Sequence, residues 1–206
     1  LASYDRALAL EPERADILDT RGASLQALKR PEEALASYQR ALGFDPCHVE
    51  ALNNHGIELG ALNRHDEAIA SYDLALALTP GDPDVHCNRG IALQGLNRHE
   101  EAIASYERAM ALGPDHAESH WNAALARLCV GNLPAGWREY EWRWKRKNAG
   151  RQRAFCEPRW SGKEDIGGKR LLIWAEQGLG DTLQFCRYAP VLAKSSSVRT
   201  INARRS

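Results

Sequence analysis

The chain has 206 residues, of which 44% are hydrophobic and 26% charged, a composition typical of a folded globular protein and not of a disordered one. No stretch approaches the roughly 20 consecutive apolar residues that a membrane-spanning helix needs, so an integral membrane protein is not expected. The net charge is zero, but residues 1–120 carry 20 acidic and 10 basic side chains, whereas residues 121–206 carry 7 and 17. Two opposite compositions in one chain predict two structural regions.

The cysteine and histidine content gives no sign of a disulfide framework or a metal site. The five cysteines form no C-x-x-C pair and are odd in number, which favours a reducing, cytoplasmic compartment. His116 and His120 have helical i, i+4 spacing, but no third ligand accompanies them. We therefore expect structural roles for both histidines, and neither a metal nor a cofactor.

A period of 34 residues dominates the first 150 residues. It places prolines at 12, 46, 80 and 114, tyrosines at 4, 38, 72, 106 and 140, and glycines at 22, 56 and 90. Two long segments nearly copy one another, since residues 63–80 read NRHDEAIASYDLALALTP and residues 97–114 read NRHEEAIASYERAMALGP. A fixed period of this length predicts a stacked solenoid.

Each 34-residue unit contains two helical patterns. In residues 49–82 the first pattern places apolar and small residues on one stripe, and a second helix follows a break at Asn63–Arg64, from about Asp66. Gly56 in the first helix and Ala68 in the second are expected to be small because the two helices approach closely. Pro80 then ends the second helix.

This period and residue pattern resembles the tetratricopeptide repeat (TPR) family. The resemblance assigns residues 1–14 to the end of an earlier unit, 15–48, 49–82 and 83–116 to three full units, and 117–150 to a degenerate, capping unit in which Ala124 replaces the glycine and Gly136 the alanine. It implies an α-solenoid, wound as a right-handed superhelix, with a concave groove lined by the first helix of each unit.

The resemblance also implies which residues face the groove. The sixth residue of three successive units is an asparagine, namely Asn54, Asn88 and Asn122, and the fifth residues include Asn53 and Trp121. Because a side-chain amide both donates and accepts, such a ladder suits the backbone of an extended peptide. The alternative is that these asparagines merely solvate the groove.

Charge narrows the class of partner. An acidic residue recurs at the second position of each unit: Asp16, Glu50, Asp84 and Glu118. No pair of basic residues is present of the kind that a TPR carboxylate clamp uses to hold a peptide C-terminus. A neutral or basic extended protein segment is therefore favoured over an acidic one.

The segment that follows the repeats is aromatic and basic. On a helix, Trp137, Tyr140 and Trp144 would share one stripe and form a packing surface. The alternative is that these rings and the basic residues of 143–153 form a patch that binds nucleic acid. The acidic charge of the repeats makes this alternative the less expected one. Residues 151–169 have no clear period and read as a linker.

Residues 170–206 change to a strand-and-helix pattern. An apolar run at 170–175 is typical of a buried parallel strand, residues 182–194 are helical, and a second strand starts near Val198. These elements predict the first βα unit of an incomplete α/β domain, whose exposed strand edge favours self-association. Gly178 and Gly180, between the strand and the helix, are candidates for a phosphate-binding loop, although Leu183 stands where a dinucleotide fingerprint has Gly or Ala.

The order of these pieces is similar to that of bacterial TPR proteins with a glycosyltransferase-like domain, of the two-lobed type found in the O-linked N-acetylglucosamine transferases and heptosyltransferases. The resemblance rests on GWREYEWRW (136–144), RAFCEPRWSG (153–162) and KRLLIWAEQGLGDTLQFCRYAPVL (169–192). It implies that Asp181 is a general base, whereas the residues alone also allow Asp181 to cap the following helix.

We therefore expect a mainly α-helical TPR scaffold that binds an extended protein segment, followed by a truncated start of a glycosyltransferase-like domain at 170–206. Most of a two-lobed transferase fold is absent from these residues, so we do not expect this chain to be an enzyme. A sugar transferase as the full-length parent stays the alternative, and nucleic-acid binding a less expected one.

Overall fold

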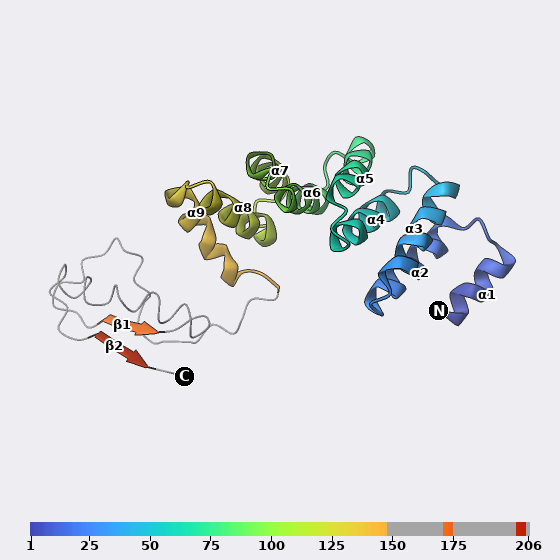
Figure 1. Ribbon diagram of the computed structural model, residues 1–206, viewed down its shortest axis with the longest axis horizontal. Helices are drawn as coiled ribbons and strands as arrows, with labels where there is room; N and C mark the ends of the chain where they lie inside the picture. The colour runs from blue at the N-terminus through green and yellow to red at the C-terminus, as the bar shows by residue number, and fades with distance from the viewer. Residues whose placement is uncertain (148–170, 175–200, 205–206) are drawn as a thin grey trace. The chain divides into compact units, whose positions relative to one another are not determined.

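The structure is a computed structural model that describes residues 1–147, 171–174 and 201–204. Residues 1–152 and 153–206 form two separate compact units. The described part of the first unit holds nine α-helices and one 3₁₀ turn (Figure 1): α1 (Ala2–Leu10), α2 (Ala15–Ala27), α3 (Pro31–Phe44), α4 (Val49–Ala61), α5 (His65–Leu78), α6 (Pro83–Gly95), α7 (His99–Leu112), α8 (Ala117–Cys129), α9 (Leu133–Tyr140) and η1 (Glu141–Trp144).

The helices stack as pairs. The pairs α2–α3, α4–α5, α6–α7 and α8–α9 each pack together, and the second helix of one pair packs against the first helix of the next. The first helices also contact one another in series, α2 on α4, α4 on α6 and α6 on α8 (Figure 1). The predicted stack of helix pairs is thus confirmed, and α2, α4, α6 and α8 form one continuous row.

A left-handed backbone residue joins the two helices of each pair. Lys29, Asn63 and Asn97 have φ values of 57°, 59° and 59°, and Gly131 has a φ of 82°. These four residues are 34 positions apart, so the same turn recurs in each unit. In the second unit it lies at the break expected at Asn63–Arg64. At the other end of the unit, α5 ends at Leu78, two residues before Pro80.

Close contact between paired helices depends on the glycine of each first helix. A Cβ atom built on Gly56 would lie 2.5 Å from Cε1 of Tyr72, and Gly22 and Gly90 meet Tyr38 and Tyr106 in the same way. The predicted close approach is therefore correct, and the group that requires it is the tyrosine ring. Ala68 is fully buried beside this contact, within a core that runs continuously across several units.

The fourth unit is built differently. Ala124 replaces the glycine, so the place taken by a tyrosine ring in the other units is blocked by a methyl group, and Tyr140 packs against Trp121 instead. Gly136 on α9 now provides the close approach, since a Cβ there would lie 2.7 Å from the side chain of Leu128. Of the expected stripe of Trp137, Tyr140 and Trp144, the first two rings lie 5.4 Å apart between centroids, whereas Trp144 lies in the 3₁₀ turn that follows the end of α9 at Tyr140.

In the second unit, β1 (Leu171–Trp174) and β2 (Ile201–Arg204) pair in parallel, with Leu171 opposite Ile201 and Trp174 opposite Arg204. They lie in the two segments where strands were expected. The linker at 151–169, the Gly178–Gly180 loop, Asp181 and the helix at 182–194 all lie outside the described residues. No helix in the described part of the chain is both long and apolar enough to cross a membrane.

Candidate functional site

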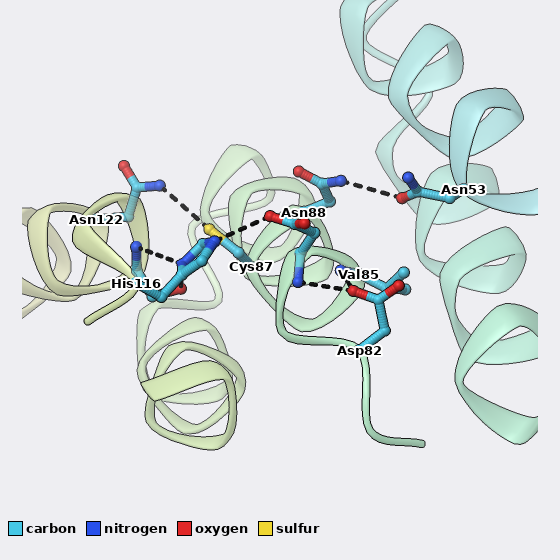
Figure 2. A network of polar contacts seen from close by, with 9 residues as sticks. Asn53, Asp82, Val85, Cys87, Asn88, His116 and Asn122 are labelled. Atoms are coloured by element: carbon cyan, nitrogen blue, oxygen red, sulfur yellow. Dashed lines mark hydrogen bonds and ion pairs between the residues drawn. The ribbon is translucent and has the colours of Figure 1, made fainter. Parts of the chain in front are cut away.

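The predicted asparagine ladder lies on the row of first helices and links neighbouring units. Asn54 Nδ2 donates to Asp19 Oδ1 at 3.0 Å, and Asn88 Nδ2 donates to Asn53 Oδ1 at 3.0 Å. Asn122 Nδ2 makes the corresponding, longer contact of 3.7 Å with Cys87 Sγ (Figure 2). Each sixth-position amide therefore contacts the fifth residue of the preceding unit. We call Asn54, Asn88 and Asn122 the amide row.

These contacts orient the amide row without using up its hydrogen-bonding capacity. A primary amide has two N–H donors and a carbonyl oxygen with two lone pairs, and each inter-unit contact uses one donor. All three asparagines are only half-buried. Their carbonyl oxygens and second N–H groups are thus positioned at intervals of one unit along the row, on rigid helices.

The thiol of Cys87 is the weakest acceptor in this series. Cys87 is 3% exposed, and its burial raises the pKa of the thiol, which favours the neutral form. A neutral thiol accepts hydrogen bonds poorly. Asn122 is accordingly held less firmly than Asn54 or Asn88.

A row of carboxylates lies one helical turn before the amide row. The second-position residues Asp16, Glu50, Asp84 and Glu118, which we call the acid row, precede the sixth position by four residues and so share its helix face. Asp16 bonds Arg14, and this hydrogen bond is the main reason that the pKa of Asp16 is lowered to about 2. Asp84 Oδ1 lies 2.9 Å from His116 Nε2, and Glu118 Oε2 lies 2.8 Å from Arg146 Nε.

The residues just before three first helices cap them. His48 Nδ1 and His116 Nδ1 accept hydrogen bonds from the backbone N–H groups of Ala51 and Ser119, each at 3.2 Å, and Asp82 caps α6 in the same position (Figure 2). Capping satisfies backbone donors that the helix itself leaves unpaired. The structure thus gives His116 the structural role expected from the sequence, as helix cap and as partner of Asp84.

His120 also has a structural role, at the end of the array. Its Nδ1 contacts Glu139 Oε2, and its Nε2 lies 2.9 Å from the carbonyl oxygen of Pro114. The Trp142 ring stacks on His120 with centroids 3.8 Å apart, which fixes η1 against α8. Helical spacing in the sequence could not predict the contact between His120 and Trp142, because Trp142 lies in the 3₁₀ turn.

Aromatic rings and basic side chains of this chain pack together at the C-terminal end of the row of first helices. Trp121, the fifth residue of the last unit, lies 4.8 Å from Tyr140 between ring centroids, and the guanidinium of Arg146 lies over Trp121 at 5.1 Å. Lys145 Nζ lies 3.7 Å from the Trp142 ring centroid. Of the predicted packing surface, Tyr140 takes part in this cluster, whereas the Trp137 side chain is 54% exposed. Basic residues from the start of the 143–153 segment lie against the cluster.

Comparison with known families agrees with this architecture. A model described as TPR repeat matches residues 58–97, and two models described as tetratricopeptide repeat match residues 15–47 and 83–116. This part of the chain is a tetratricopeptide repeat array. Of the two rows, Asp16, Asp84 and Asn88 lie within the matched residues.

One relative and several solved structures resemble parts of this chain. Protein FlbA of Caulobacter vibrioides is 40% identical over 70 residues, which make up 33% of this chain and 11% of FlbA, so the chain spans about a ninth of that relative. A crystal structure of MamA matches with a TM-score of 0.64 and 20% identity, over 68% of this chain and 81% of MamA. The first TPR domain of RPAP3, described as bound to the HSP90 peptide SRMEEVD, matches with a TM-score of 0.56 and 24% identity, over 57% of this chain and 94% of that one. At these identities the two structures show a shared fold.

Proposed function

We propose that this chain is a protein-interaction scaffold that holds an extended polypeptide along the face formed by α2, α4, α6 and α8. The observation that carries the proposal is the amide row, whose members are oriented by inter-unit contacts and still expose hydrogen-bonding groups. An extended peptide presents free backbone N–H and C=O groups along its length, which an amide binds regardless of peptide sequence. The RPAP3 domain, which shares this fold, was solved with a peptide bound.

The rigidity of the row favours binding. A loop that presented the same amides would have to lose conformational freedom when the peptide binds, whereas these asparagines are already placed by helices. Neighbouring packed helices lie about 8–10 Å apart, and an extended chain advances about 3.3 Å per residue. One amide therefore meets the peptide backbone about every third residue.

The test is a peptide array probed with the full chain and with the triple variant Asn54→Ala, Asn88→Ala, Asn122→Ala. We expect the triple variant to lose binding of the peptides that wild type retains, while circular dichroism shows unchanged helicity. Asn132→Ala is the matched control, because Asn132 is exposed and its side chain does not cap α9. Equal retention of peptides by wild type and a folded triple variant would refute the role of the amide row.

The resemblance to sugar transferases stays a prediction about the whole protein. Its candidate general base, Asp181, and its candidate phosphate loop, Gly178 and Gly180, lie outside the described residues. Calorimetric titration with uridine and adenosine diphosphate sugars tests it, and micromolar binding would support it. For nucleic-acid binding, we note that Lys145 and Arg146 already lie over rings of the chain itself, which favours the peptide proposal.

A further inference from the structure

The acid row and the amide row form one surface with a regular arrangement. In each of α4, α6 and α8, an acidic residue stands one turn before the asparagine of the amide row, so a ligand that follows the amides passes the carboxylates as well. The side chains of Glu50 and Asp84 are each 76% exposed. Residues 1–120, which include all of this surface except Asn122, carry twice as many acidic as basic side chains.

The chain itself shows how this surface holds a cationic side chain. Arg146, which follows the last helix pair, places its Nε 2.8 Å from Glu118 Oε2 and its guanidinium over the ring of Trp121. Glu118 is the second residue and Trp121 the fifth residue of the last unit. An arginine from outside the helix pairs is thus held by the acid-row residue and by the fifth-position residue next to the amide row. We call this arrangement the Arg146 site.

In the second unit the acid-row residue is Glu50, and it has the least well matched basic neighbour of the row. His48 Nδ1 lies 3.4 Å from Glu50 Oε2, but that nitrogen accepts the N–H of Ala51 and so has no proton to give to the carboxylate. Asp84, by contrast, has His116 Nε2 at 2.9 Å, and Asp16 bonds Arg14. Glu50 therefore carries an exposed charge without a matched donor from its nearest basic neighbour. Its fifth-position neighbour is Asn53, so an arginine there would meet the carboxylate and side-chain amides but no aromatic ring.

We propose that the polypeptide held by the scaffold is a basic one, with arginine side chains that bind the acid row as Arg146 does, and with Glu50 as the main open carboxylate. This inference rests on the proposed function and adds the chemistry of the partner. The spacing of the first helices sets the pattern of the ligand, because a helix spacing of about 8–10 Å corresponds to about three residues of extended chain. In the polyproline II form of an extended chain, which has three residues per turn and rises about 3.1 Å per residue, arginines at every third position lie on one side and reach successive units, whereas adjacent arginines do not.

The experiment measures fluorescence anisotropy of the full chain with four labelled, end-blocked 12-residue peptides. The first has arginine at every third position with serine and glycine between, the second has neutral citrulline in place of arginine, the third has the same arginines in one contiguous block, and the fourth has glutamate in place of arginine. We expect the first peptide to bind at least about tenfold more tightly than the others, because a complementary charge pattern also disfavours wrong partners. Glu50→Gln is expected to weaken its binding about threefold, the size of one partly exposed ion pair.

A matched variant separates a specific site from general attraction. Glu100→Gln removes the same charge from the exposed start of α7 and is expected to leave the affinity unchanged. Equal effects of Glu50→Gln and Glu100→Gln, or equal affinity for the spaced and contiguous peptides, would overturn the arginine inference. If the arginine and citrulline peptides bind equally well, and Asn88→Ala weakens the binding of both, the arginine inference is overturned and the proposed function stays intact. Absence of binding by all four peptides would contradict both.

Discussion

The ring of Tyr72 occupies the space that a side chain on Gly56 would need, with Cε1 of the ring 2.5 Å from where a Cβ atom would lie. Tyr72 is 3% exposed, so the ring has no room to withdraw toward solvent without opening the core. The same pair recurs at Gly22 with Tyr38 and at Gly90 with Tyr106. One glycine–tyrosine contact thus sets the distance between the helices of each full unit.

Gly56→Ala is expected to lower the free energy of unfolding by about 1–3 kcal/mol, because the added methyl group overpacks a buried contact. Gly60→Ala, four residues later on the same helix, is the matched control, since nothing lies within 4 Å of its Cβ position. It is expected to be neutral or to stabilise by up to about 1 kcal/mol through helix propensity. Thermal unfolding followed by circular dichroism checks both, and equal stability of the two variants would contradict the packing argument.

Lys29→Asn is expected to stabilise the array. Lys29 has a φ of 57° in the turn where the next two units have asparagine with a φ of 59°. A left-handed conformation costs an ordinary residue about 1–2 kcal/mol, and asparagine tolerates it better. Urea unfolding should show a gain of about 0.5–1 kcal/mol for Lys29→Asn, which is less than the full cost because asparagine in this conformation still bears part of it, and a similar loss for the reverse change, Asn63→Lys. A loss of stability in Lys29→Asn would show that Lys29 is held by something other than the turn.

Glu58 gives the array a defined pH dependence. It is 3% exposed, and its Oε2 has no hydrogen-bond partner among the described residues. Burial is the main cause that raises the pKa of Glu58, the charge of Glu32 adds to it, and a hydrogen bond from Gln26 opposes it. The folded state therefore binds this proton more tightly than the unfolded state, so stability declines as the pH rises from the ordinary glutamate pKa through the raised one.

Glu58→Gln, which cannot ionise, is expected to remove this decline. The variant should unfold at a higher temperature than wild type at pH 7.5, with the difference shrinking toward pH 4, where Glu58 is protonated in both states. The size of the gain is set by how far burial raises the pKa of Glu58, because each pKa unit corresponds to about 1.4 kcal/mol. The control Glu100→Gln, on an exposed residue, should show no such trend. A difference between wild type and Glu58→Gln that is constant with pH would refute the assignment.

The contact between Asn53 and Asn88 is expected to couple neighbouring units. A double-mutant cycle with Asn53→Ala and Asn88→Ala should give an interaction free energy of about 0.5–1.5 kcal/mol, typical of a hydrogen bond. The cycle with Cys87→Ala and Asn122→Ala should give a smaller value, because its 3.7 Å contact joins an amide to a thiol. Chemical denaturation measures both cycles, and an equal or larger value for the thiol pair would contradict the order drawn from the geometry.

The 34-residue period predicted the helix pairs and the small residue at Gly56, whereas the position of the amide row followed from the resemblance to the TPR family. These features follow from local chemistry that repeats with the sequence: a proline near each unit's end, a glycine where two helices cross, and an amide at the same position of successive first helices. Because each unit contacts only its neighbours, a local pattern is enough to specify a repeat array. The strong resemblance between units made the prediction of the stack possible without any tertiary information.

The tertiary structure decided which partner each of these residues has. Three of these contacts join residues 28–35 positions apart in the sequence: Asn88 with Asn53, Asp84 with His116, and Glu118 with Arg146. Whether the paired atoms come within hydrogen-bond distance depends on how one helix pair is rotated against the next. In the last unit Ala124 stands at the position of the glycine that faces a tyrosine ring in the other units. The helix α9 is followed by a 3₁₀ turn, and this turn places the Trp142 ring against His120. The sequence determined the repeat because its physics is local, whereas the contacts that orient the amide row and form the Arg146 site arise only when the units are packed together.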